Sequence, residues 1–262
     1  MAGYMDDDWL PPSEDEEEEA AECELPDYGD VNFWTEVYTQ QRGRELAPQE
    51  WLVSYGHFCA QGWRRFLPPG GRVLDLGCGD AEFMTEAYDD GYHDITGVDI
   101  VEPVLETMRQ RNVDRPGMTY LWADAMDLSV FEDESFDVVF DKSTLDALKC
   151  RGAEATSSMS SEVHRVLRRD GVYLCISLNP PEDAQPAIEG TACGRKWDVE
   201  VMVCENENYD GADGPPKHLY MKISSKRLRR QQPTGCGLQW VPNSLLKYHL
   251  VCLNISADVC KH

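Results

Sequence analysis

Hydrophobic and polar positions follow two different periods along the middle of the chain. Short apolar runs, typical of buried strands, alternate with longer stretches whose apolar residues recur at the spacing of an amphipathic helix. The strand candidates are residues 72–76, 94–98, 118–122, 136–140 and 171–178, and the helix candidates are residues 80–90, 101–112 and 155–169. Strands separated by helices in this way predict an α/β fold with a doubly wound, mostly parallel sheet.

Both ends of this segment add further elements. Residues 32–41 and residues 49–66 carry aromatic and aliphatic side chains at helical spacing, so each predicts an amphipathic helix before the first strand. After Pro180-Pro181 the pattern changes to alternation, with strand candidates at residues 197–204 and 218–223 around a polar loop. The sequence therefore predicts an antiparallel hairpin at the end of the sheet.

The turn after the first strand candidate carries the strongest functional signal. Residues 73–79 read Val-Leu-Asp-Leu-Gly-Cys-Gly, and in the turn Gly77 and Gly79 have no Cβ, so a ligand can approach the backbone closely. Asp99 ends the next strand candidate, at the spacing of an acid that binds ribose hydroxyls. Together these residues predict a nucleotide-binding pocket.

The same stretch favours S-adenosylmethionine over a nicotinamide dinucleotide. The usual dinucleotide fingerprint has a third glycine three positions after the second, and this chain has Glu82 there. Asp75, inside the strand, also departs from that fingerprint. We therefore expect S-adenosylmethionine as the cofactor, with its carboxylate near the start of the helix at Asp80.

Charge is unevenly distributed along the 262 residues, whose formal net charge is −24. Residues 1–30 hold 13 acidic residues and no lysine or arginine, which predicts a disordered acidic head. Residues 224–262 are basic and predict a tail that is disordered or docks elsewhere, which leaves the folded domain at residues 31–223. An acidic body repels nucleic acid and attracts basic surfaces, so we expect a basic protein as the partner and no nucleic acid.

The cysteines and the longest apolar runs indicate in which cellular compartment the protein is expected. The ten cysteines include no CxxC pair and no cluster with histidine at zinc spacing, so we expect reduced thiols and no metal. The acidic amino-terminal stretch does not resemble a signal peptide, and no apolar run reaches 18 residues. We therefore expect a cytoplasmic protein with no membrane partner, acting as a monomer.

Four stretches together resemble one family of enzymes. They are residues 33–38, residues 48–55, residues 73–79, and residues 135–148, which read Ser-Phe-Asp-Val-Val-Phe-Asp-Lys-Ser-Thr-Leu-Asp-Ala-Leu. The chain is similar to the class I, seven-stranded S-adenosylmethionine-dependent methyltransferases. More narrowly, it resembles the methyltransferase-like proteins that modify lysines of translation elongation factor 1A, including the group associated with endothelin-converting enzyme 2. The likeness covers residues 31–223, and the fourth stretch is its most specific part.

The resemblance implies which residues contact the nucleoside. Asp99 would bind both ribose hydroxyls, an arrangement suited to an ionised carboxylate, and Ile100 would flank the adenine. Asp124 and Ala125 match positions that contact adenine in the family, and Lys142 matches a further cofactor contact. From the residues alone, Asp124 equally fits a helix N-cap and Lys142 a solvated loop.

The resemblance also gives a role to three aromatic residues near the start of the domain. Trp34, Tyr38 and Trp51 would close over the cofactor, because aromatic faces attract a sulfonium. At helical spacing the same residues equally fit core packing. The full set of expected cofactor-binding residues is Trp34, Tyr38, Trp51, Gly77, Gly79, Asp99, Ile100, Asp124, Ala125 and Lys142.

Two acids near the end of the fourth strand candidate are the expected catalytic residues. Asp141 and Asp146 would position the ammonium of an acceptor lysine and release its proton through water, although Asp146 also fits a cap or a pair within a short helix. The chain departs from the family at Ser143, where the family has glycine after the lysine. If that position needs a positive φ, Ser143 is strained or the loop is rebuilt.

These expectations favour a protein-lysine N-methyltransferase that acts on elongation factor 1A or a similar basic protein. Two alternatives stay open: a cofactor-binding scaffold without catalysis, and a methyltransferase for small molecules.

Overall fold

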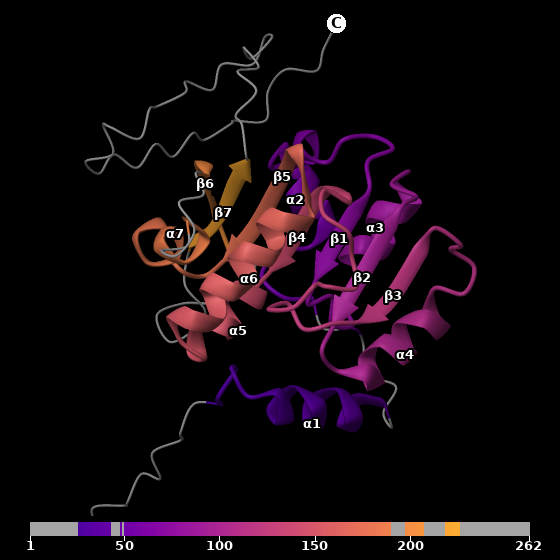
Figure 1. Cartoon of the computed structure of the whole chain (residues 1–262). Helices are drawn as coiled ribbons and strands as arrows, with labels where there is room; N and C mark the ends of the chain where they lie inside the picture. The colour runs from indigo at the N-terminus through magenta and orange to yellow at the C-terminus, as the bar shows by residue number, and fades with distance from the viewer. Residues whose placement is uncertain (1–25, 43–47, 49, 190–196, 207–217, 226–262) are drawn as a thin grey trace, which may run out of the picture. The chain divides into compact units, whose positions relative to one another are not determined.

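The computed structural model describes residues 26–42, 48, 50–189, 197–206 and 218–225, and these form an α/β unit around a seven-stranded sheet (Figure 1). The strands are β1 (Val73–Leu76), β2 (Ile95–Asp99), β3 (Met118–Trp122), β4 (Phe136–Lys142), β5 (Leu167–Ser177), β6 (Asp198–Glu205) and β7 (His218–Ser225). The helices are α1 (Val31–Arg42), α2 (Tyr55–Ala60), the 3-10 helix η1 (Trp63–Phe66), α3 (Phe83–Asp89), α4 (Glu102–Arg111), α5 (Thr144–Cys150), α6 (Ala153–Val166) and α7 (Pro181–Glu189).

The strand order is β3-β2-β1-β4-β5-β7-β6. The first five strands in this order pair in parallel, and β7 pairs antiparallel with both β5 and β6. The expected doubly wound, mostly parallel sheet with a terminal antiparallel hairpin is therefore confirmed. The chain reverses its direction of winding between β1 and β4, where an open α/β sheet leaves a crevice at its carboxyl edge.

Helices cover both faces of the sheet, and each face has its own hydrophobic core (Figure 1). The helices α2, α3 and α4 pack on one face, where Phe58, Phe83 and Leu105 are buried. The helices α5, α6 and α7 pack on the other face, with Leu145 and Val163 in their core. This two-sided burial explains why the central strands read as almost continuous apolar runs.

The helix expected over residues 49–66 is wrong. Leu52 has a φ of 59° and lies in a tight turn in which the backbone N–H of Val53 donates to the carbonyl of Trp51 at 2.6 Å. The α2 helix begins only after Ser54, whose hydroxyl accepts from the N–H of His57, and a left-handed Gly62 separates α2 from η1. The apolar residues of this segment all face the core, although the backbone between them is not one continuous helix. Their spacing along the sequence therefore resembled that of a single amphipathic helix.

Other boundaries shift by a few residues. The helix expected to begin near Asp80 begins at Phe83, because the turn that carries Gly79 continues past the strand. The helix expected over residues 155–169 ends at Val166, where β5 begins. The α7 helix was not expected, although its first residue, Pro181, is well suited to the first turn of a helix.

The ends of the domain lie partly outside the described residues. Of the expected acidic head, residues 26–30 form a turn in which Tyr28 packs edge-on against Phe33, and residues 1–25 are outside the description. Of the expected basic tail, only residues 224–225 are described, as the end of β7. Within the described part of the chain, no helix combines the length and the apolar character needed to cross a membrane.

Replacing Phe58 tests the core beneath the amino-terminal segment. Its ring is fully buried and lies within 6.3 Å of the rings of Tyr55, Trp63, Phe83 and Phe140. Phe58→Ala should lower the free energy of unfolding by about 3–5 kcal/mol, measured by urea denaturation. The control Val203→Ala changes a side chain that is 56% exposed on β6 and should shift it by less than about 0.5 kcal/mol. Similar changes in the free energy of unfolding for the two variants would contradict the burial of Phe58 in this core.

Candidate functional site

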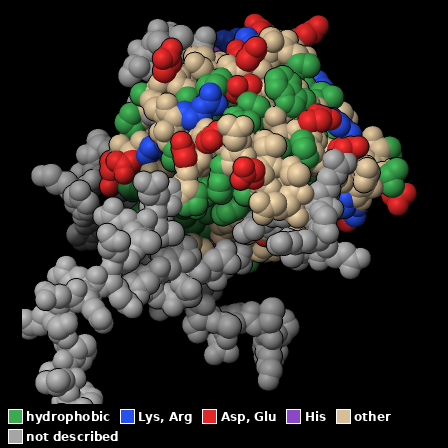
Figure 2. All heavy atoms as spheres, turned by 90° about the horizontal axis from the view of Figure 1, so that it is seen from below, with side chains coloured by type: hydrophobic (Ala, Val, Ile, Leu, Met, Phe, Trp, Pro, Cys, Tyr) green, Lys and Arg blue, Asp and Glu red, His purple; other side chains and the backbone are tan. Residues whose placement is uncertain are grey.

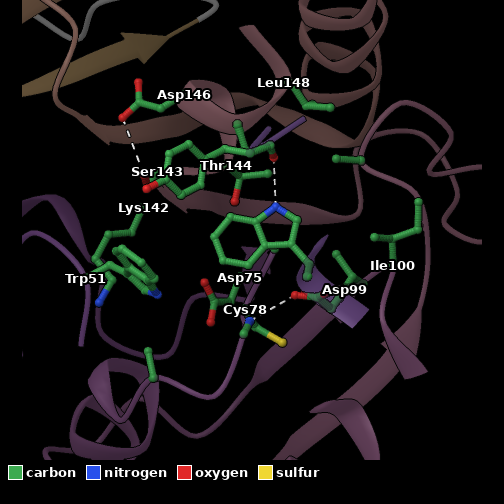
Figure 3. A pocket seen from close by; sticks show the side chains of 18 of the residues that line it. Trp51, Asp75, Cys78, Asp99, Ile100, Lys142, Ser143, Thr144, Asp146 and Leu148 are labelled. Atoms are coloured by element: carbon green, nitrogen blue, oxygen red, sulfur yellow. Dashed lines mark hydrogen bonds between the residues drawn. The ribbon is translucent and has the colours of Figure 1, made fainter. Parts of the chain in front are cut away.

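A cavity of about 390 Å³ opens at the carboxyl ends of the parallel strands. It lies at the switch point between β1 and β4 and is also lined by the ends of β2 and β3 and by α1. Its volume is within the usual range for small-molecule sites. Figure 3 shows Asp75 and Asp99 in the lower part of the view, Asp146 and Leu148 at the top, and Trp51 and Lys142 at the left.

The structure brings almost all of the expected site residues to this cavity. Those that line it are Trp34, Tyr38, Trp51, Gly77, Gly79, Asp99, Ile100, Asp124, Ala125, Lys142 and Asp146. Asp141 is the exception and does not line it. The individual roles of these residues stay predictions.

The turn after β1 requires glycine at two positions, because the backbone there has a positive φ and because neighbouring side chains leave no room for a Cβ. Gly77 has a φ of 68°, and a Cβ there would overlap the Thr144 side chain. Gly79 has a φ of 52°, and a Cβ there would lie 2.6 Å from the hydroxyl of Tyr38. Both positions are therefore closed to larger residues, which leaves bare backbone facing the cavity.

The Asp99 carboxylate is held by backbone donors from two loops. The N–H of Gly79 donates to Oδ2 at 3.0 Å, and the N–H of Val101 donates to Oδ1 at 3.0 Å. Burial raises the pKa of Asp99, and these backbone hydrogen bonds counteract that rise. An ionised carboxylate has about four lone-pair sites, so Asp99 can also accept from two sugar hydroxyls.

Asp75 is a functional candidate that sequence reasoning did not assign to the site. Its carboxyl lines the cavity and makes no hydrogen bond within the described residues. Burial, followed by the negative charges of Asp141 and Asp99, raises the pKa of Asp75 to about 8. An acid inside an otherwise apolar strand was the signal that could have identified it, because a buried carboxyl without a partner is costly unless a ligand supplies one.

The α1 helix places an aromatic wall on the cavity. Trp34 lies 6.2 Å from the ring of Tyr38 in a stacked arrangement and 5.9 Å from the ring of Trp51 in an edge-on one. The indole N–H of Trp34 donates to the carbonyl of Tyr28 at 2.8 Å. Burial, followed by the carboxylates of Asp99 and Asp80, raises the pKa of Tyr38, so its phenol stays neutral.

The cavity wall near the ends of β2 and β3 is apolar except for the carboxylate of Asp124. Ile100 and Ala125 supply the apolar part, and the indole N–H of Trp122 donates to the carbonyl of Ile100 at 2.8 Å. Asp124 accepts from the N–H of Met126 at 2.9 Å, which fixes the turn after β3. No helix follows Asp124 between β3 and β4, a segment that the structure describes in full, so the interpretation of Asp124 as a helix N-cap is wrong, while its position on the cavity fits a ligand contact.

Lys142 is bound to the loop before α2. Its ammonium forms an ion pair with Glu50, lies 3.4 Å from the carbonyl of Val53 and lies 5.1 Å from the centre of the Phe83 ring. The side chain is 7% exposed, so it is not the solvated loop residue that its sequence context allows. Lys142 thereby fixes the tight turn that presents Trp51 to the cavity.

Asp146 and Ser143 form the end of the cavity opposite Asp75. Oδ1 of Asp146 accepts from the hydroxyl of Ser177 at 2.5 Å and from the amide of Asn179 at 2.6 Å, and Oδ2 accepts from the N–H of Leu178 at 3.0 Å. The Ser143 hydroxyl lies 3.5 Å from Oδ2 of Asp146 (Figure 3). Asp146 therefore ties the turn after β5 to α5.

Ser143 adopts the left-handed conformation that was expected to be a problem there. Its φ is 73° and its ψ is −2°, and its N–H donates to the carbonyl of Ile176 at 3.0 Å. The loop is therefore not rebuilt, and the serine carries the strain that a glycine avoids.

Asp141 is a buried anchor beneath α5. It is 0% exposed, and its carboxyl accepts from the hydroxyl of Tyr173 at 2.7 Å and from the N–H of Thr144 at 2.8 Å. Burial raises the pKa of Asp141 to about 6, although its hydrogen bond with Tyr173 acts in the opposite direction. The N-cap residue of α5 is Ser143, whose side chain makes no capping bond, and Asp141 supplies the acceptor for the first N–H groups of the helix instead.

The residues of the cavity fit S-adenosylmethionine. The unpartnered carboxyl of Asp75 suits an ammonium, Asp99 suits ribose hydroxyls, and the bare backbone at Gly77 and Gly79 suits an extended amino-acid chain. The apolar wall at Ile100 suits a flat base. When bound, the cofactor would supply an electrophilic methyl group on a sulfonium.

Comparisons with known proteins agree with this geometry. Residues 74–175, from β1 to β5, match the model of the methyltransferase domain. Methyltransferase srdJ of Neurospora crassa is 30% identical over 187 residues, which are 68% of this chain and 75% of that protein. The chain belongs to the methyltransferase family. With its fold and its cavity, it is a class I methyltransferase that uses S-adenosylmethionine.

More similar relatives are much longer proteins. The eEF1A lysine and N-terminal methyltransferase of Bos taurus is 41% identical over 218 residues, and that of Homo sapiens is 36% identical over 196 residues. These alignments cover 81% and 73% of this chain but only 30% and 27% of the relatives, so the chain spans less than a third of their length. A methyltransferase solved in complex with the Trm112 activator of Haloferax volcanii has a TM-score of 0.55 at 14% identity, covering 79% of this chain and all of that one, which supports the fold alone.

Replacing Asp99 tests the ribose end of the cavity. Asp99→Ala should weaken S-adenosylmethionine binding by about 100-fold or more, because each hydrogen bond to a charged group contributes about 1.5–3 kcal/mol. Isothermal titration calorimetry measures the change. Asp94→Ala, at the exposed amino-terminal side of β2, is the control and should leave the affinity unchanged. Binding of the Asp99 variant within a few-fold of the unmodified protein would remove Asp99 from the site.

Replacing Asp75 tests the unpartnered carboxyl through pH. The folded-state pKa of about 8 lies above the usual value of 3.8, so the folded protein keeps a proton that the unfolded chain loses. The free energy of unfolding should therefore fall as the pH rises from about 4 to about 8. The Asp75→Asn side chain cannot ionise and should not lose stability in this way. The Tm of the variant minus the Tm of the unmodified protein should therefore increase by at least a few degrees from pH 5 to pH 8. Parallel curves for the two proteins in calorimetry without ligand would contradict the raised pKa.

Proposed function

We propose that this methyltransferase acts on the side-chain amine of lysine in a basic protein, and that translation elongation factor 1A is the acceptor to test first. Relatives named eEF1A lysine and N-terminal methyltransferase support this acceptor. The acidic chain, with a formal net charge of −24, supports a basic partner.

One observation carries the amine part of the proposal. Besides the carboxylates of Asp75 and Asp99, the cavity is lined by Trp34 and Trp51, and its opposite end is lined by Asp146 (Figure 3). Aromatic faces and a carboxylate both attract an ammonium, and an aliphatic lysine stem packs against indole rings. An acceptor at this end would thus approach the cofactor site from the side of α1. Hydrophobic side chains gather near the centre of this face, with both acidic and basic ones around them (Figure 2).

The acceptor amine must lose a proton before it can act as a nucleophile. A free lysine has a pKa of about 10.4 and is protonated at neutral pH. The apolar side chains of Leu148 and Leu178 line the same end of the cavity, and removal from water lowers the pKa of an ammonium. The proposal therefore assigns deprotonation to desolvation, with the proton leaving to water.

The two acids expected to be catalytic then have different roles. Asp146 is saturated with donors, so in this proposal it shapes the acceptor end and attracts the ammonium instead of taking its proton. Asp141, which does not reach the cavity, holds the start of α5 and acts as a positioning residue. Most of the rate enhancement would come from alignment of the two reactants.

Labelling tests the proposal directly. We expect purified elongation factor 1A, incubated with the protein and S-adenosylmethionine labelled in its methyl group, to gain label on a lysine, located by mass spectrometry. Asp99→Ala protein is the control and should transfer almost no label.

Other outcomes would overturn lysine as the acceptor. Label at the amino-terminal amine would indicate N-terminal methylation. When a cell lysate replaces the purified factor, label in the low-mass fraction would indicate a small-molecule substrate. Cofactor binding with no label in either mixture would indicate a scaffold.

A further inference from the structure

A lysine is buried in the sheet where nothing in the cofactor site requires one. Lys222 on β7 is 0% exposed and lies between Met221 and Ile223, which pack into the core on the opposite face. The row of paired residues across the sheet continues from Lys222 to Cys175 on β5 and Asp141 on β4. A buried ammonium is unfavourable unless it is paired and hydrogen-bonded, so the contacts of Lys222 indicate what it does.

Lys222 contacts the turn that follows β5. Its ammonium donates to the carbonyl of Asn179 at 2.8 Å and lies 5.7 Å from the ring centre of Tyr220. Burial lowers the pKa of Lys222, while the Cys175 thiol and the carboxylates of Asp146 and Asp141 act in the opposite direction. The carboxylates on the same side of the sheet therefore favour the charged form of Lys222, which burial disfavours.

Asn179 joins Lys222 to the acceptor end of the cavity. Its side-chain amide donates to Oδ1 of Asp146 at 2.6 Å, and its side-chain oxygen accepts from Lys149 of α5 at 2.6 Å. Its backbone N–H donates to the hydroxyl of Ser177 at 2.9 Å. The turn over residues 177–179 is thus held by Lys222 from the sheet and by Asp146 and Lys149 from α5.

This turn forms part of the wall that the acceptor would meet. Leu178 and Asp146 both line the cavity, and the N–H of Leu178 donates to Asp146. A shift of the turn would move both side chains together. The cofactor end, formed by Asp75, Gly79 and Asp99, lies at the ends of β1 and β2, and within the described residues no hydrogen bond or ion pair joins it to Lys222.

We propose that Lys222 is a positioning residue for the acceptor: it fixes the turn at residues 177–179 and, through Asn179, the orientation of Asp146. This inference rests on the proposed function, since it assigns the acceptor to that end of the cavity. Lys222 touches neither the cofactor site nor the acceptor.

The variant Lys222→Met keeps the length of the side chain and removes its charge and its donors. Hydrogen exchange of the Leu178 and Asn179 amides should become at least 10-fold faster, because the turn loses its anchor on the sheet. The affinity for S-adenosylmethionine should stay within two-fold. The KM for elongation factor 1A should rise at least 10-fold more than the KM for the cofactor.

Met221→Leu is the matched control, because it conserves volume at the neighbouring position on the opposite face of β7. It should change neither the exchange of the turn nor either KM. If Lys222→Met does not fold, Asn179→Ala removes the side-chain link to Asp146 at a half-buried position and should give the same selective rise in acceptor KM.

The hydrogen-exchange measurement needs no acceptor, so it separates this inference from the proposed function. Unchanged exchange in a folded Lys222→Met protein would overturn the inference even if lysine methylation is observed. Faster exchange with an unchanged acceptor KM would overturn it as well. Failure of the unmodified protein to methylate elongation factor 1A would count against the proposed function, and the exchange result would then decide whether Lys222 holds the turn.

Discussion

The hydrogen bond between the N–H of Gly79 and the carboxylate of Asp99 connects the two loops on which the cofactor site depends. It joins the turn after β1 to the end of β2, which are parallel neighbours in the sheet. Only a left-handed Gly79 can direct its N–H this way while leaving room for Tyr38 of α1. The hydrogen bond from the N–H of Gly79 to Asp99 thus fixes the turn to the sheet in the conformation that leaves room for the aromatic wall of α1.

Charged side chains with little exposure hold the loops around the rest of the cavity. Lys142 holds the strained turn at Leu52, and Asp141 accepts from the first N–H groups of α5. Lys222 and Asp146 hold the turn after β5 from opposite sides. Parallel strands end in loops that have no ladder partners of their own, and buried ionic contacts supply the partners that those loops lack.

Local signals in the sequence were sufficient for much of the fold and of the cofactor end. The strand before Gly77 and the strand that Asp99 ends are short apolar runs, and both were identified correctly, as was the position of Asp99 beside the glycine turn. The broken segment before β1 was not, because its apolar residues have helical spacing while Leu52 and Gly62 adopt left-handed conformations. Sequence periodicity reports which residues are buried, but it does not report the backbone path between them.

Contacts between distant parts of the chain could not be predicted. Glu50 and Lys142 are far apart in sequence, as are Asn179 and Lys222, and each pair is joined only by the tertiary fold. Asp141 and Asp146 are both acids near the end of β4, yet one lies under α5 and the other lines the cavity. This difference depends on how α5 packs on the sheet, which composition and spacing do not specify.

Ser143 shows how a family position can vary without remodelling its surroundings. Its backbone already has the left-handed conformation that glycine adopts freely, at a cost of about 1–2 kcal/mol for a residue with a Cβ. Exchange between serine and glycine at this position therefore leaves the loop path unchanged and adds or removes one hydroxyl beside Asp146. The hydroxyl at position 143 can therefore be gained or lost at little cost to the fold, and each exchange changes the hydrogen-bonding groups at this end of the cavity.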